Sequence, residues 1–418
     1  MAKIIKIVGR QVFDSRGNPT VEADVFLNNK VKASAIVPSG ASTGAFEAYE
    51  LRDNKKNYFL GKSVLIAVKN INNLIHKNLK NVDSGNQKKI DKILVDLDGT
   101  KNKKKLGANT LLAVSLAVSK AEAISKKKEL YQHLGKKFTL PKPQMNIING
   151  GAHADNNLRI QEFMIRPDSA KNFMDAIEKC FLVIQNLKKI LQSKKLLTNV
   201  GDEGGFAPSI NSNEEALNLI VDAIQKSKLK PGIDINICLD VAANELINAD
   251  GNYSLNSSEF ISVEKSIDYY KSLVSKFPIK SIEDPFAEED WKAWKKITYE
   301  IGKNVQIVGD DLFVTNVERL KRGIKEKSAN SILIKVNQIG TLTETLDVIE
   351  LAKRNNFSTI ISHRSGDTED TFIADLAVAT RSTQIKTGSL ARSERVAKYN
   401  RLLRIEEQLG KTSKIARI

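Results

Sequence analysis

Two kinds of hydrophobic pattern follow one another in the first third of the chain. Residues 21–25 (VEADV) alternate apolar and polar side chains, as in a strand with one buried face, and residues 17–19 (GNP) are typical of a turn. Residues 62–79 and 108–134 instead place apolar side chains three and four positions apart, which predicts helices, and Asn109 is a suitable cap for the second. Residues 1–134 are therefore expected to form a small α+β domain.

The pattern changes after residues 135–143, a segment with two prolines that suits a domain boundary. From there on, short β-prone runs recur with helix-like segments between them. Strands and helices that alternate over about 250 residues predict a parallel barrel, so residues 135–418 are expected to form an α/β barrel. The runs are residues 144–148, 162–165, 235–239, 279–282, 305–308, 331–336, 358–362 and 384–387.

Polar residues stand at the C-terminal ends of six successive runs. By subtraction of their positions, the first two are 43 residues apart and the later ones 23 to 28, which mostly fits one strand and one helix per interval. Active sites of such barrels lie at the mouth formed by the C-terminal strand ends, so these side chains are expected to converge on one site. They are Asp240, Glu283, Asp310, Lys335, His363 and Lys386.

Three of these residues, Asp240, Glu283 and Asp310, are carboxylates on successive strands. Clustered carboxylates raise one another's pKa unless a cation lies between them. Oxygen ligands favour Mg²⁺, Ca²⁺ or Mn²⁺ over Zn²⁺, so the three predict a site for a hard divalent cation. The alternative is that each carboxylate merely ends a strand or caps a helix.

Lys335 and Glu203 are the candidates for proton transfer. Lys335 lies in an apolar run, where scarce water and nearby cations would lower its pKa and let it act as a base. The alternative is a snorkelling side chain or a buried ion-pair partner. Glu203 lies in residues 201–205 (GDEGG), whose glycines let the backbone turn sharply beside a ligand, although a plain acidic turn has the same composition. Another acid, Glu162, begins the second β-prone run.

Three further segments have the composition of ligand-binding loops. Residues 363–366 (HRSG) combine an arginine, a hydroxyl and backbone amides, which is a common way to hold phosphate, and Lys386 would add charge. Residues 38–44 (PSGASTG) are small and flexible enough for a lid, or form an ordinary loop. Residues 149–153 (NGGAH) resemble a substrate loop, although a histidine such as His153 is more often structural.

Composition narrows the class of protein. The 418 residues are 41% hydrophobic and 27% charged, which is ordinary for a globular protein of two or three domains. Cys180 and Cys238 form no CxxC pair, so neither a disulfide framework nor a cysteine metal site is expected, and a reducing compartment fits. The N-terminus does not read as a signal peptide, and no apolar run is long enough for a membrane span.

The net charge of +16, from 65 Lys and Arg against 49 Asp and Glu, is high. An excess of this size also occurs in nucleic-acid-binding proteins. The lysine runs at residues 101–105 and 126–128 lack interleaved aromatics, and no zinc-finger or RNA-recognition motif is present. Solvated helix faces and loops are therefore expected, and a nucleic-acid partner is not.

Taken together, these segments resemble the enolase family (phosphopyruvate hydratases), in its bacterial form, from near the first residue to near the last. The resemblance implies a C-terminal enolase-type (β/α)8 barrel and a smaller N-terminal α+β domain that carries the lid loop. The matching strings are residues 14–20 (DSRGNPT), 39–44 (SGASTG), 96–100 (DLDGT), 201–205 (GDEGG), 281–284 (SIED), 309–311 (GDD) and 362–366 (SHRSG).

The resemblance implies a hydro-lyase that reversibly dehydrates 2-phosphoglycerate to phosphoenolpyruvate in glycolysis and gluconeogenesis. By this likeness Lys335 removes the C2 proton and Glu203 protonates the departing 3-hydroxyl, with Glu162 assisting and His363 also catalytic. Two Mg²⁺ ions are implied, a structural one on Asp240, Glu283 and Asp310, and one that arrives with substrate beside Ser42. The implied substrate contacts are His153, Glu162, Glu283, Asp310, Lys335, Ser362, His363, Arg364, Ser365 and Lys386.

Two positions depart from the family pattern as we expect it: Tyr49 stands where leucine is usual, and Asn244 where serine is expected. The charge of +16 is also unusual for the family and leaves the partners open. The resemblance implies a cytoplasmic homodimer without membrane insertion, with a cell-surface or secreted pool as a secondary location. The alternatives are a superfamily enzyme acting on another acid, a surface adhesin or plasminogen receptor, and a component of an RNA-degradation complex.

Overall fold

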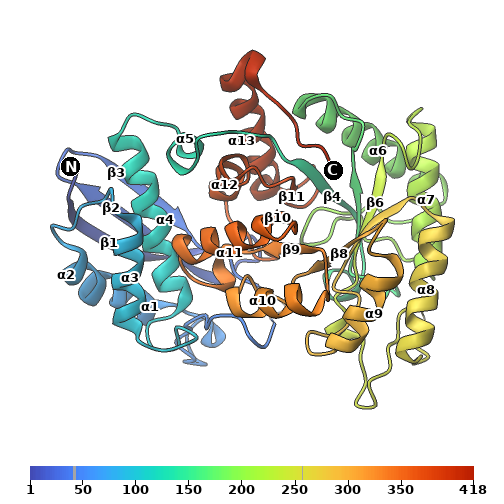
Figure 1. The fold of residues 1–418 in the computed structure, drawn as a ribbon, viewed down its shortest axis with the longest axis horizontal. Coiled ribbons are helices and arrows are strands. Elements are labelled where there is room, and N and C mark those ends of the chain that lie inside the picture. The colour runs from blue at the N-terminus through green and yellow to red at the C-terminus, as the bar shows by residue number, and fades with distance from the viewer. Residues whose placement is uncertain (41–43, 257) are drawn as a thin grey trace.

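The computed structural model of this protein describes residues 1–40, 44–256 and 258–418. A three-stranded sheet and its helices lie at one side of the molecule, and a closed eight-stranded barrel surrounded by helices lies at the other (Figure 1). The C-terminal segment returns to the start of the barrel, where Leu140 and Ile415 form a bridge. The α/β prediction, with a barrel and a smaller α+β unit, is confirmed.

The N-terminal unit is built on an antiparallel sheet in the order β1-β2-β3. Helix α4 is buried along almost its whole length, because it contacts β2 and β3 on one side and α3 and α11 on the other. The elements are β1 (Ile4–Phe13), β2 (Pro19–Leu27), β3 (Lys32–Ile36), η1 (Phe59–Gly61), α1 (Leu65–Asn70), the π-helical turn η2 (Ile71–Ile75), α2 (His76–Leu79), α3 (Gln87–Asp98), α4 (Ala108–Ser125) and α5 (Leu130–Leu134).

The two helices predicted in this unit are both interrupted. The first begins only at Leu65 and contains the π-helical turn η2, and the second is divided into α4 and α5. Asn109 is not the cap of α4, because Gly107 occupies that position. The Asn109 side chain instead accepts a hydrogen bond from the N–H of Leu51 at 3.0 Å and donates one to its carbonyl at 3.1 Å. It therefore anchors an extended segment rather than the helix start.

The barrel closes in the order β10-β11-β4-β5-β6-β7-β8-β9. Each predicted β-prone run corresponds to one of its strands. The elements are β4 (Lys142–Asn149), η3 (Gly151–His153), β5 (Glu162–Arg166), α6 (Phe173–Ser193), α7 (Asn213–Lys226), β6 (Asn236–Asp240), η4 (Ala243–Glu245), α8 (Val263–Lys276), β7 (Ile279–Glu283), α9 (Trp291–Ile301), β8 (Gln306–Gly309), α10 (Val317–Glu326), β9 (Ser331–Ile334), η5 (Val336–Gln338), α11 (Leu342–Arg354), β10 (Ser358–Ser362), α12 (Phe372–Thr380), β11 (Gln384–Lys386), α13 (Ser393–Leu409) and η6 (Gly410–Thr412).

The prediction of an entirely parallel barrel is wrong for one strand, because β5 pairs antiparallel with both β4 and β6. Residues 150–161, between β4 and β5, contain only the single turn η3. A parallel pair needs a crossover that usually includes a helix, so this short connection produces a hairpin. The reversal places Glu162, the first residue of β5, opposite Asn149 and Asp240 at the mouth.

The same reversal explains how Glu203 reaches the mouth. Because β5 runs away from the mouth, two helices are needed before β6, and α6 and α7 pack against each other as a pair. The segment that joins them, residues 194–212, lies at the mouth, where the N–H of Phe206 donates to the carbonyl of Ile147 at 2.9 Å. The glycine-rich loop is thus attached to the end of β4.

Side-chain caps mark where six of the barrel helices begin. Each cap accepts a hydrogen bond from a backbone N–H of the first helical turn, which stabilises a helix by about 1 kcal/mol. The caps are Asn172, Ser212, Ser262, Asp290, Asn316 and Thr341.

The remaining expectations concern thiols and membrane spans. Cys180 and Cys238 are buried free thiols, and Cys238 packs within a barrel strand. Among the described residues, no helix combines the length and apolarity that a membrane span requires.

Candidate active site

A cavity at the mouth of the barrel brings together most of the residues predicted from the sequence. Five of the six strand-end side chains line it, and the sixth, Glu283, lies behind it in contact with Lys386. Ser42 lies outside the described residues. The lining residues are His153, Gln161, Glu162, Glu203, Asp240, Ala242, Asp284, Asp310, Asp311, Lys335, Ser362, His363, Arg364, Ser365 and Lys386.

Asp284 and Asp311 also line the cavity, and no role for either was predicted from the sequence. Each directly follows a predicted strand-end carboxylate, and this pair of adjacent acidic residues is the sequence feature that could have identified them. Asp284 has a φ of +42°, which is unusual for a residue other than glycine and often marks a functional position. Its carboxylate accepts hydrogen bonds from the N–H groups of Asp310 and Asp311, both at 2.9 Å. Asp284 therefore holds the turn that presents Asp310.

Lys386 is the centre of a buried ion cluster. Its Nζ lies 2.7 Å from Oδ2 of Asp240, 2.9 Å from Oε1 of Glu283 and 3.2 Å from Oε1 of Glu162. Burial disfavours the ammonium, but the carboxylates outweigh burial and raise the pKa of Lys386 well above its usual value. Burial and neighbouring carboxylates also raise the pKa of Glu162 and of Glu283. One lysine thus partly compensates several buried acids.

Lys335 forms an ion pair with Asp310, whose other oxygen accepts a hydrogen bond from Gln338 Nε2 at 2.9 Å. The sequence predicts a lowered pKa for Lys335, but its pKa is raised in this structure. Burial lowers the pKa, but Asp310, the strongest of the neighbouring charges, and other carboxylates such as Glu283 together outweigh burial. The prediction assumed cations beside Lys335, whereas the dominant neighbour here is an anion. Lys335 can accept a proton only when this ion pair is loosened.

The mouth contains oxygen ligands suited to a divalent cation. Among the described residues, one carboxylate oxygen from each of Asp284, Asp310 and Asp311 lies within 4.8 Å of the others. This group shares only Asp310 with the predicted set, because the other two predicted carboxylates face Lys386. Burial and the charge of Asp310 raise the pKa of Asp311 to about 7, as expected for crowded carboxylates. The acidic groups present can therefore hold a hard cation.

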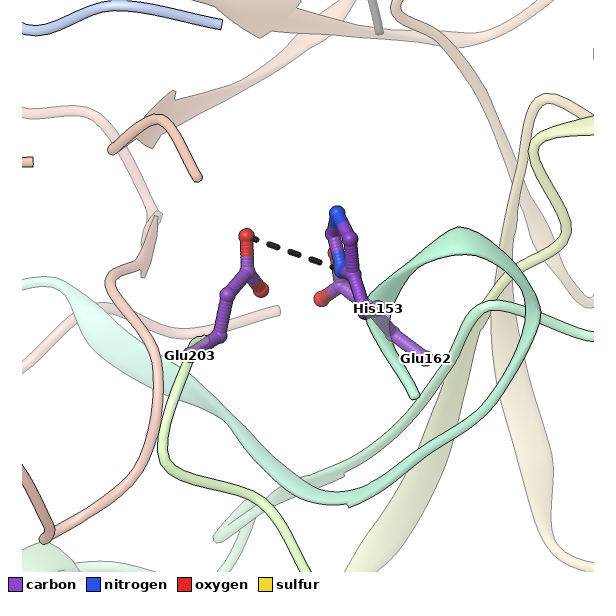
Figure 2. A group of neighbouring side chains, drawn as sticks. All are labelled: His153, Glu162 and Glu203. Atoms are coloured by element: carbon purple, nitrogen blue, oxygen red, sulfur yellow. Dashed lines mark ion pairs between the residues drawn. The ribbon is translucent and has the colours of Figure 1, made fainter. Parts of the chain in front are cut away.

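His153, Glu162 and Glu203 form a second buried cluster (Figure 2). Figure 2 shows Glu203 approaching from one side and His153 and Glu162 from the other. Nδ1 of His153 lies 3.6 Å from Oε1 of Glu162 and 3.9 Å from Oε1 of Glu203. All three residues come from the part of the barrel around β5 that departs from parallel order. The hairpin and the α6–α7 connection thus place one histidine within reach of two carboxylates.

The two carboxylates of this cluster have opposite proton affinities. Oε2 of Glu203 lies 3.3 Å from Nε2 of His363 and accepts a hydrogen bond from Asn146 Nδ2 at 3.3 Å. Burial raises the pKa of Glu203, but positive charge on His363 and His153, when these rings are protonated, outweighs burial and lowers it well below its usual value. Burial and the charge of Glu203 raise the pKa of Glu162. Of the two, Glu162 therefore holds a proton more readily.

The N-terminal unit closes one side of the site. Nη1 of Arg364 lies 2.9 Å from Oε2 of Glu47. The backbone N–H of Ser39 donates to the carbonyl of Gly366 at 2.7 Å, and Gly366 donates back at 2.9 Å. These contacts attach the segment that enters the predicted lid to the loop predicted to hold phosphate.

Lys335 and Glu203 approach the cavity from different sides of the barrel. Lys335 directly follows β9, whereas the Glu203 segment is hydrogen-bonded to β4. In the closed strand order, β10 and β11 lie between β9 and β4 on one side, and β5 to β8 lie between them on the other. A ligand in the cavity would therefore lie between Lys335 and Glu203.

Comparison with known proteins covers nearly the entire chain. Residues 4–134 match the family model described as "Enolase, N-terminal domain", and residues 137–417 match "Enolase, C-terminal TIM barrel domain". The chain is 61% identical over 420 residues to a protein named enolase from Pelagibacter ubique (strain HTCC1062), and the match covers 100% of both sequences. With a barrel whose mouth gathers the acids and lysines described above, this chain belongs to the enolase family of hydro-lyases.

Proposed function

We propose that this protein catalyses the reversible dehydration of 2-phosphoglycerate to phosphoenolpyruvate, in glycolysis and gluconeogenesis. The observation that carries the proposal is the position of a partly buried lysine, Lys335, and a buried acid, Glu203, on different sides of one cavity. Removal of a proton beside a carboxylate builds negative charge on the substrate. Such a reaction needs a base on one side, an acid on the other and positive groups around the charge.

Each proton has an assigned carrier. Neutral Lys335 takes the proton from C2, and Glu203 delivers a proton to the 3-hydroxyl, which leaves as water. An unperturbed lysine, with a pKa of about 10.4, is already almost fully protonated at neutral pH. The contact with Asp310 favours the charged form further, so Lys335 must lose this contact before it can act as a base. The raised pKa of Glu162 suits it to supply the proton that Glu203 delivers. His363, whose Nε2 faces Glu203, completes the catalytic group.

Positive and hydrogen-bonding groups in the cavity fit a substrate with a phosphate and a carboxylate. The planar guanidinium of Arg364 can bind phosphate oxygens through two parallel hydrogen bonds, and Lys386 contributes a point charge. The proposed substrate contacts are His153, Glu162, Glu283, Asp310, Lys335, Ser362, His363, Arg364, Ser365 and Lys386.

Mg²⁺ is the cation that we assign to the acidic groups of the mouth. The proposed ligands of a first ion are Asp240, Glu283 and Asp310. Asp284 and Asp311 form the competing set, because their oxygens lie close to those of Asp310. A second ion, arriving with substrate, is assigned to Ser42. When bound, the ions supply positive charge that offsets the charge developing on the substrate carboxylate.

The proposed assembly and location rest first on family membership. We assign a homodimer, a cytoplasmic location, and a domain division between residues 134 and 135. The dimer proposal has some support on the surface of the N-terminal unit. Phe13 and Phe59 are exposed with ring centroids 5.7 Å apart, and the neighbouring Leu60 is 85% exposed. A contiguous apolar patch of this kind suits coverage by a second chain.

The test is the formation of phosphoenolpyruvate from 2-phosphoglycerate, followed by ultraviolet absorbance with Mg²⁺ or with a chelator. We expect activity only with the cation, and a loss of about 10²- to 10⁴-fold in Lys335→Ala, as for removal of a general base. Glu203→Gln should lose dehydration but retain exchange of the C2 proton with D2O, because Lys335 is intact.

The matched control is Lys103→Ala. Lys103, like Lys335, is a lysine paired with a carboxylate, Glu344 at 2.6 Å, but it lies away from the mouth. This variant should keep its activity. An inactive wild-type protein, or a fully active Lys335→Ala variant, contradicts the proposed function.

A further inference from the structure

Arg395, in α13, is a buried guanidinium that joins two segments of the site. The residue is 0% exposed. Its Nη1 lies 2.6 Å from Nδ1 of His363 and donates to the carbonyl of Arg364 at 2.6 Å. Its Nη2 donates to the carbonyls of Ser365 at 2.7 Å and Asp202 at 3.1 Å. One side chain therefore connects the loop after β10 to the glycine-rich loop that carries the proposed acid.

The contact with His363 determines where the imidazole proton lies. A guanidinium has only donors and stays charged, so Nδ1 of His363 must act as the acceptor. In a neutral imidazole with Nδ1 as acceptor, the proton resides on Nε2. Nε2 lies 3.3 Å from Oε2 of Glu203. The ring N–H therefore lies beside the proposed acid, although it does not form a hydrogen bond with it in this structure.

The surroundings of His363 also keep it neutral. Burial lowers its pKa to about 4, and Arg395 acts in the same direction, while the carboxylates of Glu203 and Asp367 oppose both. A protonated ring would place an Nδ1–H donor against a guanidinium donor, which is unfavourable.

The backbone of Glu203 is held from the same direction. The N–H of Ser389 donates to the carbonyl of Glu203 at 2.9 Å. Gly388 has a φ of +74°, and a Cβ at this position would lie 2.6 Å from the Glu203 carbonyl oxygen and 3.0 Å from Cδ of Arg395. The Glu203 backbone is thus held by Ser389, and its carboxylate faces His363. Arg395 contacts His363 and donates to the carbonyl of Asp202, the residue before Glu203.

We propose that Arg395 is a positioning residue for the reaction: it holds His363 as the Nε2–H tautomer and aims that proton at the Glu203 carboxylate. The proposal rests on the dehydration proposed above. Once Glu203 has delivered its proton, the Nε2–H group stabilises the carboxylate that remains. The opposite tautomer would present a lone pair to that carboxylate and oppose proton delivery.

The first test is the tautomer of His363 in the full-length wild-type protein. The chain has four histidines, so nitrogen-15 labelling of histidine gives a simple long-range N–H correlation spectrum, and His363→Gln assigns the signal. We expect a protonated Nε2 and an unprotonated Nδ1 near neutral pH. A protonated Nδ1 overturns the proposal whether or not the protein acts on 2-phosphoglycerate, so the outcome is separate from the proposed function.

The second test compares Arg395→Met with Lys398→Met. Lys398, on the same helix and also 0% exposed, donates to the carbonyl of Glu394 at 2.8 Å and has no contact with His363 in this structure. Arg395→Met should give a mixture of His363 tautomers and lower kcat by about tenfold or more, as expected when the partner that orients a histidine is lost.

Lys398→Met removes an ion pair with Asp367 and hydrogen bonds to the carbonyls of Thr368 and Glu394, but no bond to His363. It should therefore leave the Nε2–H tautomer intact, while it matches the loss of one buried charge near Asp367. If Arg395→Met keeps a pure Nε2–H tautomer, or loses no more kcat than Lys398→Met, the proposal is wrong. Should Arg395→Met fail to fold, Arg395→Lys, which retains the charge but not the fork of donors, replaces it with the same two readouts.

Discussion

The ammonium nitrogen of Lys386 lies 2.7 Å from the carboxylate of Asp240, and both side chains are buried. A second carboxylate, that of Glu283, lies 2.9 Å from the same nitrogen. Asp240 and Glu283 are two of the three side chains that the sequence assigns to a divalent cation. A lysine and a metal ion can serve these acids in turn, because either one supplies the positive charge that buried carboxylates require.

Lys386→Met should destabilise the protein most when divalent cations are removed. The substitution leaves several buried carboxylates without their cation, and loss of one partner of a buried ion pair costs about 3–5 kcal/mol. Mg²⁺ should recover part of this loss, so its stabilising effect is larger in the variant than in the wild type. Urea unfolding with and without MgCl2 measures both effects. Equal stability of variant and wild type in a chelator contradicts this reading of the cluster.

The two carboxylate sets make different predictions for cation binding. If the first ion binds Asp240, Glu283 and Asp310, Asp240→Asn should weaken Mg²⁺ or Mn²⁺ binding by about tenfold or more, while Asp311→Asn changes it little. Isothermal titration calorimetry on the two variants decides the question. The reverse order of effects would assign the ion to Asp284, Asp310 and Asp311.

Gly388→Ala should impair catalysis through the Glu203 loop. The new Cβ would lie 2.6 Å from the Glu203 carbonyl oxygen, a contact too close to keep, so the acid must shift. We expect kcat to fall at least about tenfold, because small displacements of a catalytic group are costly. Gly410→Ala is the matched control: it also has a positive φ, of +51°, but a Cβ there meets nothing within 4 Å. It should cost about 1–3 kcal/mol of stability, because its backbone conformation is strained for a residue with a Cβ, and no activity.

Asp24 should make the N-terminal sheet sensitive to acid. Burial raises its pKa, but hydrogen bonds from Arg10, Ser34 and Lys32 outweigh burial and hold it below its usual range. Because the folded-state pKa lies below the unfolded value of about 3.9, this stabilisation is present above that pH and is lost as the pH falls through the folded-state pKa.

Asp24→Asn should therefore lower the free energy of unfolding at pH 7, and the difference from wild type should shrink below about pH 4. Urea titrations at several pH values measure this difference. A difference that does not change with pH would show that Asp24 acts through packing alone.

Leu60→Asp should disrupt the proposed homodimer. The side chain is 85% exposed beside two exposed aromatic rings, and burial of the new charge in an interface would be unfavourable. Light scattering after size exclusion should show a shift from dimer toward monomer. Tyr299→Asp, at an equally exposed site on α9, is the comparison that should leave the mass unchanged. A monomeric wild-type protein refutes the assembly itself.

Several features of the site follow directly from the sequence. The repeated interval of a strand and a helix predicts the barrel, and a polar residue at each strand end predicts what faces its mouth. Five of the six strand-end residues line the cavity, and Glu203 joins them from the glycine-rich loop. These predictions succeed because the spacing of apolar residues determines which local element forms, and parallel strands of one barrel end at one mouth.

The tertiary structure decided strand direction and charge pairing. The composition of a β-prone run does not indicate in which direction the strand runs through the sheet. The short connection between β4 and β5 makes β5 antiparallel, and this direction places Glu162 at the mouth. The raised pKa of Lys335 depends on Asp310, and the tautomer of His363 depends on Arg395. Such pairs join residues from separate elements, and packing alone brings them within a few ångströms. The sequence by itself therefore determined which groups are present at the mouth, and the fold determined which of them share a proton or a charge.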